Sequence, residues 1–327
     1  MNLVKKLYVI GNGFDLAHGL PTAYWDFRSF LEKRDWDFLV EFETLYGFPQ
    51  IDESDPYVNV KIWKEELKKV LWNSLEENMA EPDVSAILNT SDSIVEQLDL
   101  DGGNIGIEDT MNAYWKDRFS FIKTLPQYVS RWIENVEHEY VLNAKPRNMS
   151  MIGESNSRFI TFNYTSTLET CYHIDDKRVT HIHGSIVPYS DNMPIMGHGY
   201  KIGAYEHRQK AREADNQFDE GRKSIENAIA NIYNDTIKDT DVIIRENEHV
   251  FRKLNDIEQV IIVGLSYGNV DLPYLKKIKQ CVCRVAKWEM YYYSSTDREQ
   301  LEKVIMILDI DPSHVKIAHT NDFFTKC

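Results

Sequence analysis

The chain begins with a short apolar run of β type that ends at a glycine turn, Leu7-Tyr8-Val9-Ile10-Gly11-Asn12-Gly13. Beyond the turn, apolar side chains recur over 24–31 at the spacing of a helix with one buried face, and we expect Thr22 to cap that helix. The order of strand, glycine turn and helix leads us to look for further strands separated by helices.

Further apolar runs have the composition of strands, and helical patterns separate them. The strongest is Val260-Ile261-Ile262-Val263, which is followed by Gly264 and by a helical pattern over 273–278. Strands that alternate with helices predict a Rossmann-like α/β fold, in which helices cover both faces of a parallel sheet. The other strand-like runs lie at 157–162, 179–183, 288–293 and 315–318.

The helical patterns divide this fold into a core and an insertion. Long helical stretches at about 62–100 and 107–140 lie in a region rich in Trp and Tyr, so we predict a helical insertion over 49–150. The Rossmann-like core then comprises residues 1–48 and 151–327, with a polar helical segment at 204–256.

The composition is that of a folded protein with an acidic surface. Of the 327 residues, 43% are apolar and 27% are charged, which supports a sizeable core and argues against disorder. Lys and Arg number 37 against 52 Asp and Glu, giving a formal net charge of −15. Non-specific binding of nucleic acid is disfavoured, because phosphates require a positive field.

Cysteine spacing and hydropathy indicate where the protein acts. The four cysteines form no Cys-x-x-Cys pair, which argues against a disulfide framework and against a Cys₄ zinc site. We find neither an apolar run long enough to cross a membrane nor a signal-peptide cleavage site. We therefore expect a cytoplasmic protein with no membrane partner.

The loops that follow the four best strands carry an unusual share of polar residues. They begin near Gly11, Asn163, His183 and Gly264. Ligands of open α/β sheets bind beyond the carboxyl ends of the strands, so these loops predict one shared crevice.

The first two loops suit a nucleotide. The glycines of Gly11-Asn12-Gly13-Phe14-Asp15 let the backbone approach a phosphate at a helix N-terminus, although the full Gly-x-Gly-x-x-Gly spacing is absent. In the second loop, Asn163 can donate to and accept from a ribose hydroxyl or an attacking water. The alternative for the first loop is a tight turn without a ligand, and the alternative for the second is capping of the next helix by Asn and Thr side chains.

Two histidines stand at the third loop, in His181-Ile182-His183-Gly184. We expect both to face the same side of a strand, because side chains alternate along it. Two histidines on one side of a strand could bind a metal, but a site needs a third ligand. The only candidate, His198, lies apart from them in the sequence, so a metal is not expected. His183 suits acid–base work near neutral pH, and we expect His181 to be structural.

The fourth loop matches the Gly-x-Ser-x-Gly pattern of the α/β-hydrolase nucleophile elbow at 264–268. A catalytic triad would need an acid and then a histidine in the short stretch of chain after Ser266. No His-Gly-Gly-Gly oxyanion motif is present upstream either. A hydrolase of that class is therefore disfavoured.

Together these motifs resemble the AbiH family of bacterial abortive-infection proteins, which are implicated in phage defence. The likeness extends along the whole chain, is long and specific at the start, and is weak in the helical insertion. The residues that carry it are Ile10–Thr22 (IGNGFDLAHGLPT), Thr161–Thr165 (TFNYT), His181–Gly184 (HIHG), Gly264–Ser266 (GLS) and Asp271–Tyr274 (DLPY).

The same motifs, in the same order, are distantly similar to the sirtuin-like NAD-consuming fold. This resemblance implies that NAD, or another nucleotide, is the substrate. It implies that Asn163 holds the nicotinamide ribose or a water and that His183 is the general base. The binding residues it implies are Gly11, Asn12 and Gly13 near the phosphates, Gly264, Ser266 and Asp271 at the adenosine half, and also Phe14, Asp15, Thr161 and Gly184.

Two departures from the sirtuin pattern bear on the reaction. The paired Cys-x-x-Cys zinc ligands of sirtuin deacylases do not follow Gly184, which favours NAD glycohydrolysis over deacylation. Tyr164-Thr165 replaces the usual aspartate, and Asp15 stands where small hydroxyl residues are common, so a nucleotide other than NAD stays open.

Other functions remain alternatives. The protein can be a non-catalytic sensor of a nucleotide or phage component, with the helical insertion signalling to a partner. A nuclease-type toxin is disfavoured by the acidic charge and by the lack of carboxylates at metal-ligand spacing. A phage-derived trigger and a second copy of the chain are left open as partners.

Overall fold

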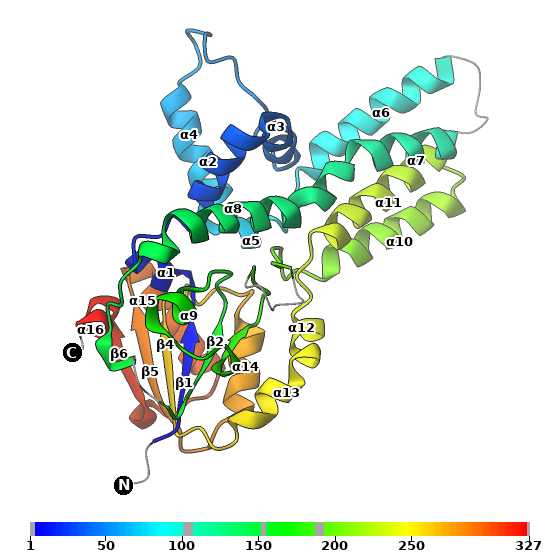
Figure 1. Ribbon diagram of the computed structural model, residues 1–327. Coiled ribbons are helices and arrows are strands. Elements are labelled where there is room, and N and C mark those ends of the chain that lie inside the picture. Colours follow the sequence, from blue (N-terminus) through cyan, green and yellow to red (C-terminus); the bar gives the residue numbers. More distant parts are fainter. Residues whose placement is uncertain (1–3, 101–106, 152–154, 187–192, 326–327) are drawn as a thin grey trace. The chain divides into compact units, whose positions relative to one another are not determined.

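The computed structural model describes residues 4–100, 107–151, 155–186 and 193–325. Within these residues, six strands form one sheet in the order β3-β2-β1-β4-β5-β6, and every neighbouring pair is parallel (Figure 1). This is the strand order of the doubly wound Rossmann sheet, and it confirms the predicted α/β class. The strands are β1 Lys6–Ile10, β2 Ser157–Thr161, β3 Val179–His181, β4 Gln259–Val263, β5 Lys287–Tyr292 and β6 Val315–His319.

The register of the central strands brings four loops to the same level. Ile10 at the end of β1 pairs with Thr161 of β2 and with Val263 of β4. Thr161 in turn pairs with His181, the last residue of β3. Because all these strands are parallel, the loops that follow them leave one edge of the sheet side by side.

Alternation along β1 assigns each face of the sheet its own core. Leu7 and Val9 belong to one apolar cluster, whereas Tyr8 and Ile10 belong to the other. The first face packs against helices α12 Thr240–Glu246, α13 Glu248–Phe251, α14 Leu272–Cys281 and α15 Ser295–Ile307, and the second against α1 Asn12–Ala17, α9 Thr167–Tyr172 and α16 Thr320–Phe324.

The chain divides into two compact units. A sheet unit comprises Met1–Ala23, Val129–Ile195 and Asp239–Cys327, and a helical unit comprises Tyr24–Tyr128 and Met196–Lys238. The helical unit is thus larger than the expected insertion over 49–150. The segment predicted at 204–256 is divided between the units. Helix α10 Ile202–Asn216 packs on α11 Glu220–Asp235, which packs on α6 Val84–Leu100 and α7 Ile107–Arg118, whereas α12 and α13 pack on α14.

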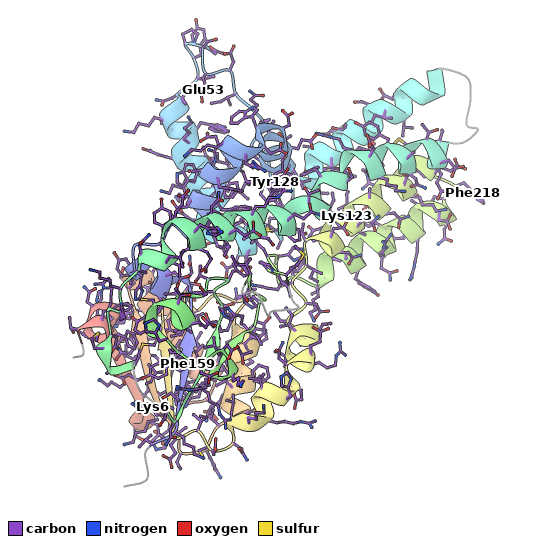
Figure 2. The ribbon with its side chains drawn as sticks, in the orientation of Figure 1. Lys6, Glu53, Lys123, Tyr128, Phe159 and Phe218 are labelled. Atoms are coloured by element: carbon purple, nitrogen blue, oxygen red, sulfur yellow. The ribbon has the colours of Figure 1, made fainter. Side chains whose placement is uncertain are left out.

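The helical unit has its own core, in which Phe27, Phe42 and Trp72 are fully buried and in contact. The predicted long helical stretches are each broken into shorter helices. Figure 2 labels Phe218, an exposed residue at the turn between α10 and α11. The helices are α2 Tyr24–Arg34, α3 Trp36–Leu45, α4 Val60–Val70, α5 Leu75–Asn78, α6 Val84–Leu100, α7 Ile107–Arg118, α8 Leu125–Glu139 (which continues into the sheet unit), α10 Ile202–Asn216 and α11 Glu220–Asp235.

The predicted cap of the first long helix is wrong. Helix α2 begins only at Tyr24, and the buried hydroxyl of Thr22 makes no hydrogen bond within the described part of the chain. The backbone of Thr22 instead contacts the first loop, since its carbonyl accepts a 2.7 Å hydrogen bond from the Asn12 side chain.

Candidate functional site

The first four strands in chain order end in loops that are joined by backbone hydrogen bonds. The Gly11 amide donates to the Val263 carbonyl at 3.0 Å, and the Gly13 amide donates to the Gly264 carbonyl at 2.8 Å. The Phe162 amide donates to Ile10, which ties the loop after β2 to β1. These bonds hold the predicted loop residues in one region at the carboxyl edge of the sheet.

Glycine is required where the loops after β1 and β4 meet. A Cβ atom on Gly11 would lie 2.5 Å from the Gly264 carbonyl oxygen, and one on Gly13 would lie 2.8 Å from the Gly264 Cα. Gly264 itself has φ of +76°, and its Cβ would lie 2.3 Å from the Phe14 nitrogen. The contact lies where the strand order reverses, the position at which open α/β sheets bind their ligands.

Asp15 is a carboxyl group with almost no exposure to solvent. Its Oδ2 accepts a 2.6 Å hydrogen bond from the Thr165 hydroxyl, which lies 3.0 Å from the hydroxyl of Thr167. Burial raises the pKa of Asp15 to about 6, although hydrogen bonds from Thr165, Thr167 and Asn163 lower it. Its Oδ1 has no hydrogen-bond partner among the described residues.

Asn163 presents a second buried acceptor beside Asp15. Its side-chain nitrogen donates to the Gly11 carbonyl at 3.2 Å, and its amide donates to the Thr161 hydroxyl at 3.1 Å. Like Oδ1 of Asp15, the side-chain oxygen of Asn163 is buried and finds no partner in the part of the chain that the structure describes. Buried acceptors in this state indicate a place for water or a ligand, since leaving them unpaired costs free energy.

His181 and Glu169 form an ion pair that holds the backbone of Asn163. The Nδ1 of His181 lies 2.9 Å from the Asn163 carbonyl, and its Nε2 lies 2.9 Å from Oε1 of Glu169. The backbone carbonyl and the carboxylate are both acceptors, which favours the doubly protonated form of the ring. Burial alone would lower the pKa of His181, but the hydrogen bond and the charge of Glu169 outweigh it and raise the pKa.

Glu137 comes to the loop from helix α8. Its carboxylate accepts hydrogen bonds from the amide and the hydroxyl of Ser166, at 2.5 and 2.6 Å. Burial raises the pKa of Glu137, partly offset by the bonds from Ser166. Sequence reasoning missed this residue because it lies in a helical stretch without a motif. Thr165, by contrast, belongs to the Thr161–Thr165 motif after β2, and Glu169 follows in helix α9.

The expectation that His181 and His183 face the same side is wrong. Strand β3 ends at His181, so alternation no longer applies at His183. The centroid of the His183 ring lies 4.9 Å from that of Phe162 and 5.2 Å from that of Tyr274. Phe162 and Tyr274 belong to the apolar core on the face of the sheet opposite to Glu169. No group of three metal-ligating His, Cys, Asp or Glu side chains occurs in the residues described.

The remaining predicted residues occupy several environments. Phe14 is fully buried against His18 and Tyr172, and Thr161 is buried under Asn163. Ser266 is exposed in the middle of the loop over 264–271 rather than at a sharp strand-to-helix elbow. Asn12 is exposed, Gly184 takes φ of +78° in the turn after β3, and Asp271 directly precedes α14.

A protein-family model described as bacteriophage abortive infection AbiH matches residues 7–292, a range that includes all four loops. The chain belongs to the AbiH family. Membership implies a role in abortive infection by bacteriophage for this AbiH protein. Searches of curated proteins and of solved structures found no match, so the sirtuin-like resemblance stays a prediction. Among the described helices of this AbiH protein, none is long and apolar enough to cross a membrane.

Proposed function

We propose that this AbiH protein binds NAD or a related nucleotide at the carboxyl edge of its sheet and hydrolyses the N-glycosidic bond. One observation carries the proposal. Asp15 in the first turn of α1 and Asn163 in the loop after β2 each present a buried oxygen that finds no partner among the described residues. A nucleotide whose ribose hydroxyls donate to these oxygens would satisfy both.

Asp15 has the properties of a general base for this hydrolysis. With a pKa of about 6 it is mostly ionised at neutral pH and still accepts a proton readily. The water oxygen bonds to ribose C1′, and the carbon–nitrogen bond breaks with its electron pair going to nicotinamide. The proton of the water passes to Asp15, whose charge also stabilises the oxocarbenium-like transition state.

Asn163 orients the reacting groups in this proposal. Its fixed side-chain nitrogen leaves the oxygen to accept from the attacking water or from a ribose hydroxyl. His183 is the alternative general base. Its ring is enclosed by Phe162 and Tyr274, so it would need substrate to enter on that face of the sheet.

The test is chromatography of NAD, NADP and ATP after incubation with the purified protein. We expect nicotinamide and ADP-ribose from the wild type, and at least about a 100-fold slower release from Asp15→Asn and Asn163→Ala. His183→Ala, measured in parallel, separates the two candidate bases. Glu299→Gln, an exposed substitution in the same unit, is the control and should keep full activity.

Each outcome has a definite meaning. Cleavage that survives both Asp15→Asn and Asn163→Ala would contradict this placement of the site. Intact nucleotides that nevertheless raise the melting temperature would support the nucleotide sensor instead of the hydrolase. Intact nucleotides without any thermal stabilisation would overturn the proposal.

A further inference from the structure

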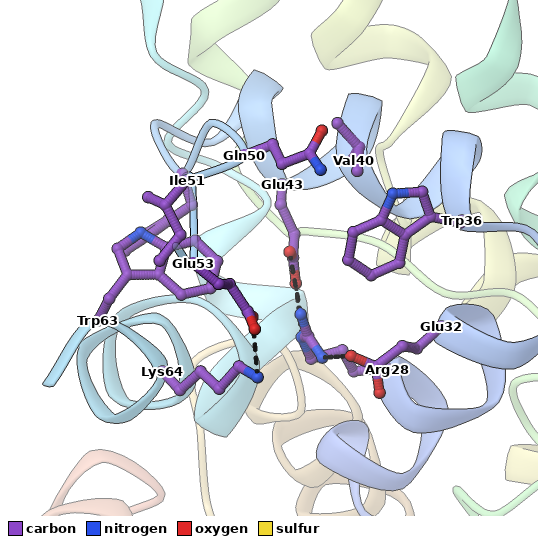
Figure 3. Close-up of a pocket in the computed structure, with 11 residues that line it drawn as sticks. Arg28, Glu32, Trp36, Val40, Glu43, Gln50, Ile51, Glu53, Trp63 and Lys64 are labelled. Atoms are coloured by element: carbon purple, nitrogen blue, oxygen red, sulfur yellow. Dashed lines mark hydrogen bonds and ion pairs between the residues drawn. The ribbon is translucent and has the colours of Figure 1, made fainter. Parts of the chain in front are cut away.

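A second binding site can be recognised in the helical unit, independently of the proposed function. Residues of α2, α3 and α4 and of the segment 48–53 line a cavity of about 280 Å³ (Figure 3). We propose that this cavity binds a single organic cation, a guanidinium or ammonium group, carried by a peptide side chain or a small molecule.

Two indole rings form the walls of the cavity. Trp36 of α3 is 44% exposed, although a large aromatic side chain of this kind is normally well buried. Trp63 of α4 packs edge-to-face against Phe48, and their ring centroids lie 6.4 Å apart. Figure 3 shows the two indoles on either side of the ion pair between Arg28 and Glu43. Indole faces attract cations, and among aromatic rings they do so most strongly.

The charges that line the cavity favour a cation over an anion. Three acidic side chains, Glu32, Glu43 and Glu53, face two basic ones. Both bases are already paired, since Arg28 contacts Glu43 at 2.7 Å and Glu32 at 3.0 Å, and Lys64 contacts Glu53 at 3.2 Å. An anionic ligand would have to break these pairs. A cation meets an excess of negative charge; it shares Glu32 with Arg28 and leaves the buried pair of Arg28 and Glu43 in place.

The floor of the cavity is preorganised for this role. Both oxygens of Glu43 accept from Arg28, and Oε1 also accepts from the Trp72 indole at 2.8 Å. The side chains of Arg28 and Glu43 are 4% and 5% exposed, so they stay in place. Glu32 is 40% exposed and is the carboxylate that an incoming cation would reach.

The size of the cavity restricts the ligand to a small group. Pockets for drug-sized molecules have volumes of about 300–1,000 Å³, so this cavity suits one side-chain headgroup. A guanidinium fits best, because it is planar, stacks on aromatic faces and donates two parallel hydrogen bonds to a carboxylate.

Calorimetric titration of the full-length protein tests the proposal. The probes are arginine methyl ester, a capped peptide with one central arginine, and the same peptide with citrulline, the neutral isostere of arginine. We expect the arginine probes to bind and the citrulline peptide to bind at least tenfold more weakly. Binding of the peptide without the free ester would identify a peptide as the source of the cation, and equal binding would identify the headgroup alone.

Variants link the binding to the cavity. We expect at least a tenfold loss of affinity for Trp36→Ala and for Glu32→Gln, of which Glu32→Gln changes only a partly exposed side chain. The controls are Tyr57→Ala and Asp37→Asn, an exposed aromatic and an exposed acid that do not line the cavity. Equal affinity for the citrulline peptide, no binding of any probe, or unchanged binding to Glu32→Gln would each overturn the proposal.

Discussion

Asp15 and His181 are the residues at which burial and charge act most clearly on the candidate site. Asp15 is an acid removed from solvent, so burial favours its protonated form despite the hydrogen bond from Thr165. His181 is buried as well, but Glu169 beside it favours the charged form. Both residues interact with Asn163: its side chain lowers the pKa of Asp15, and its carbonyl oxygen lies 2.9 Å from Nδ1 of His181.

The raised pKa of Asp15 predicts that this residue lowers stability at high pH. A folded pKa of about 6, against the ordinary aspartate pKa of 3.8, means that the folded state holds this proton more tightly than the unfolded state does. The gain in the free energy of unfolding on changing Asp15→Asn should therefore be larger at pH 8 than at pH 4, by up to about 3 kcal/mol. Urea unfolding at the two pH values measures the difference, and an equal effect at both would contradict it.

The ion pair of His181 predicts the opposite dependence. Because its folded pKa is raised, the stabilisation is present at low pH and is lost as pH increases through that pKa. Glu169→Gln should therefore destabilise the protein more at pH 6 than at pH 9. Chemical denaturation at both values, beside the exposed control Glu299→Gln, measures this. A loss that is independent of pH would show that His181 is neutral when folded.

The tightest of the backbone contacts that join the elements of the site lies between the turns after β1 and β4. That contact depends on glycine, since the loops approach more closely than any side chain allows. In the helical unit the comparable element is the pair of helices α2 and α3, joined by the buried ion pair of Arg28 and Glu43. Both features predict local substitutions with large effects.

Gly264→Ala should destabilise the protein far more than Gly19→Ala. Both residues have nearly the same left-handed φ, +76° and +77°, so the cost of backbone strain is similar, about 1–2 kcal/mol. A Cβ on Gly19 meets open space, whereas one on Gly264 meets the Phe14 nitrogen at 2.3 Å. Overpacking adds about 1–3 kcal/mol at Gly264. Equal melting temperatures for the two variants would contradict the close approach.

Arg28→Met should cost about 3–5 kcal/mol, because it leaves the buried charge of Glu43 without its partner. The matched control is Arg118→Met, which breaks an exposed pair with Glu41 of nearly the same length, 3.0 Å. That change should cost less than about 1 kcal/mol. Denaturant unfolding measures the loss of stability in each variant. A loss for Arg28→Met no larger than that for Arg118→Met would contradict a stabilising role of the buried pair.

At the scale of the whole molecule, the net charge disfavours binding of nucleic acid. The formal net charge is −15, which repels the phosphate backbone of nucleic acids. We expect no shift of a DNA or RNA duplex in gel electrophoresis at low salt, where non-specific binding is strongest. Binding that weakens steeply as salt increases would instead favour the nuclease alternative.

The strands and the class of fold were determined by the sequence itself. Runs such as Val260–Val263 are apolar on both faces, which is typical of a strand inside a parallel sheet covered on both faces by helices. The glycine turn after Ile10 was equally visible, because glycine permits close backbone approach whatever its neighbour is. The order of the strands was not visible, since it depends on contacts between segments far apart in the chain.

Only the tertiary structure decided which polar side chains meet. The contacts of Asp15 with Thr165, of Glu137 with Ser166 and of His181 with Glu169 join residues that are up to 150 positions apart. The same holds for the cavity between Trp36 and Trp63. Local pattern encodes which face of an element is buried. The distances and burial that set a pKa or form a pocket arise only when separate elements pack together.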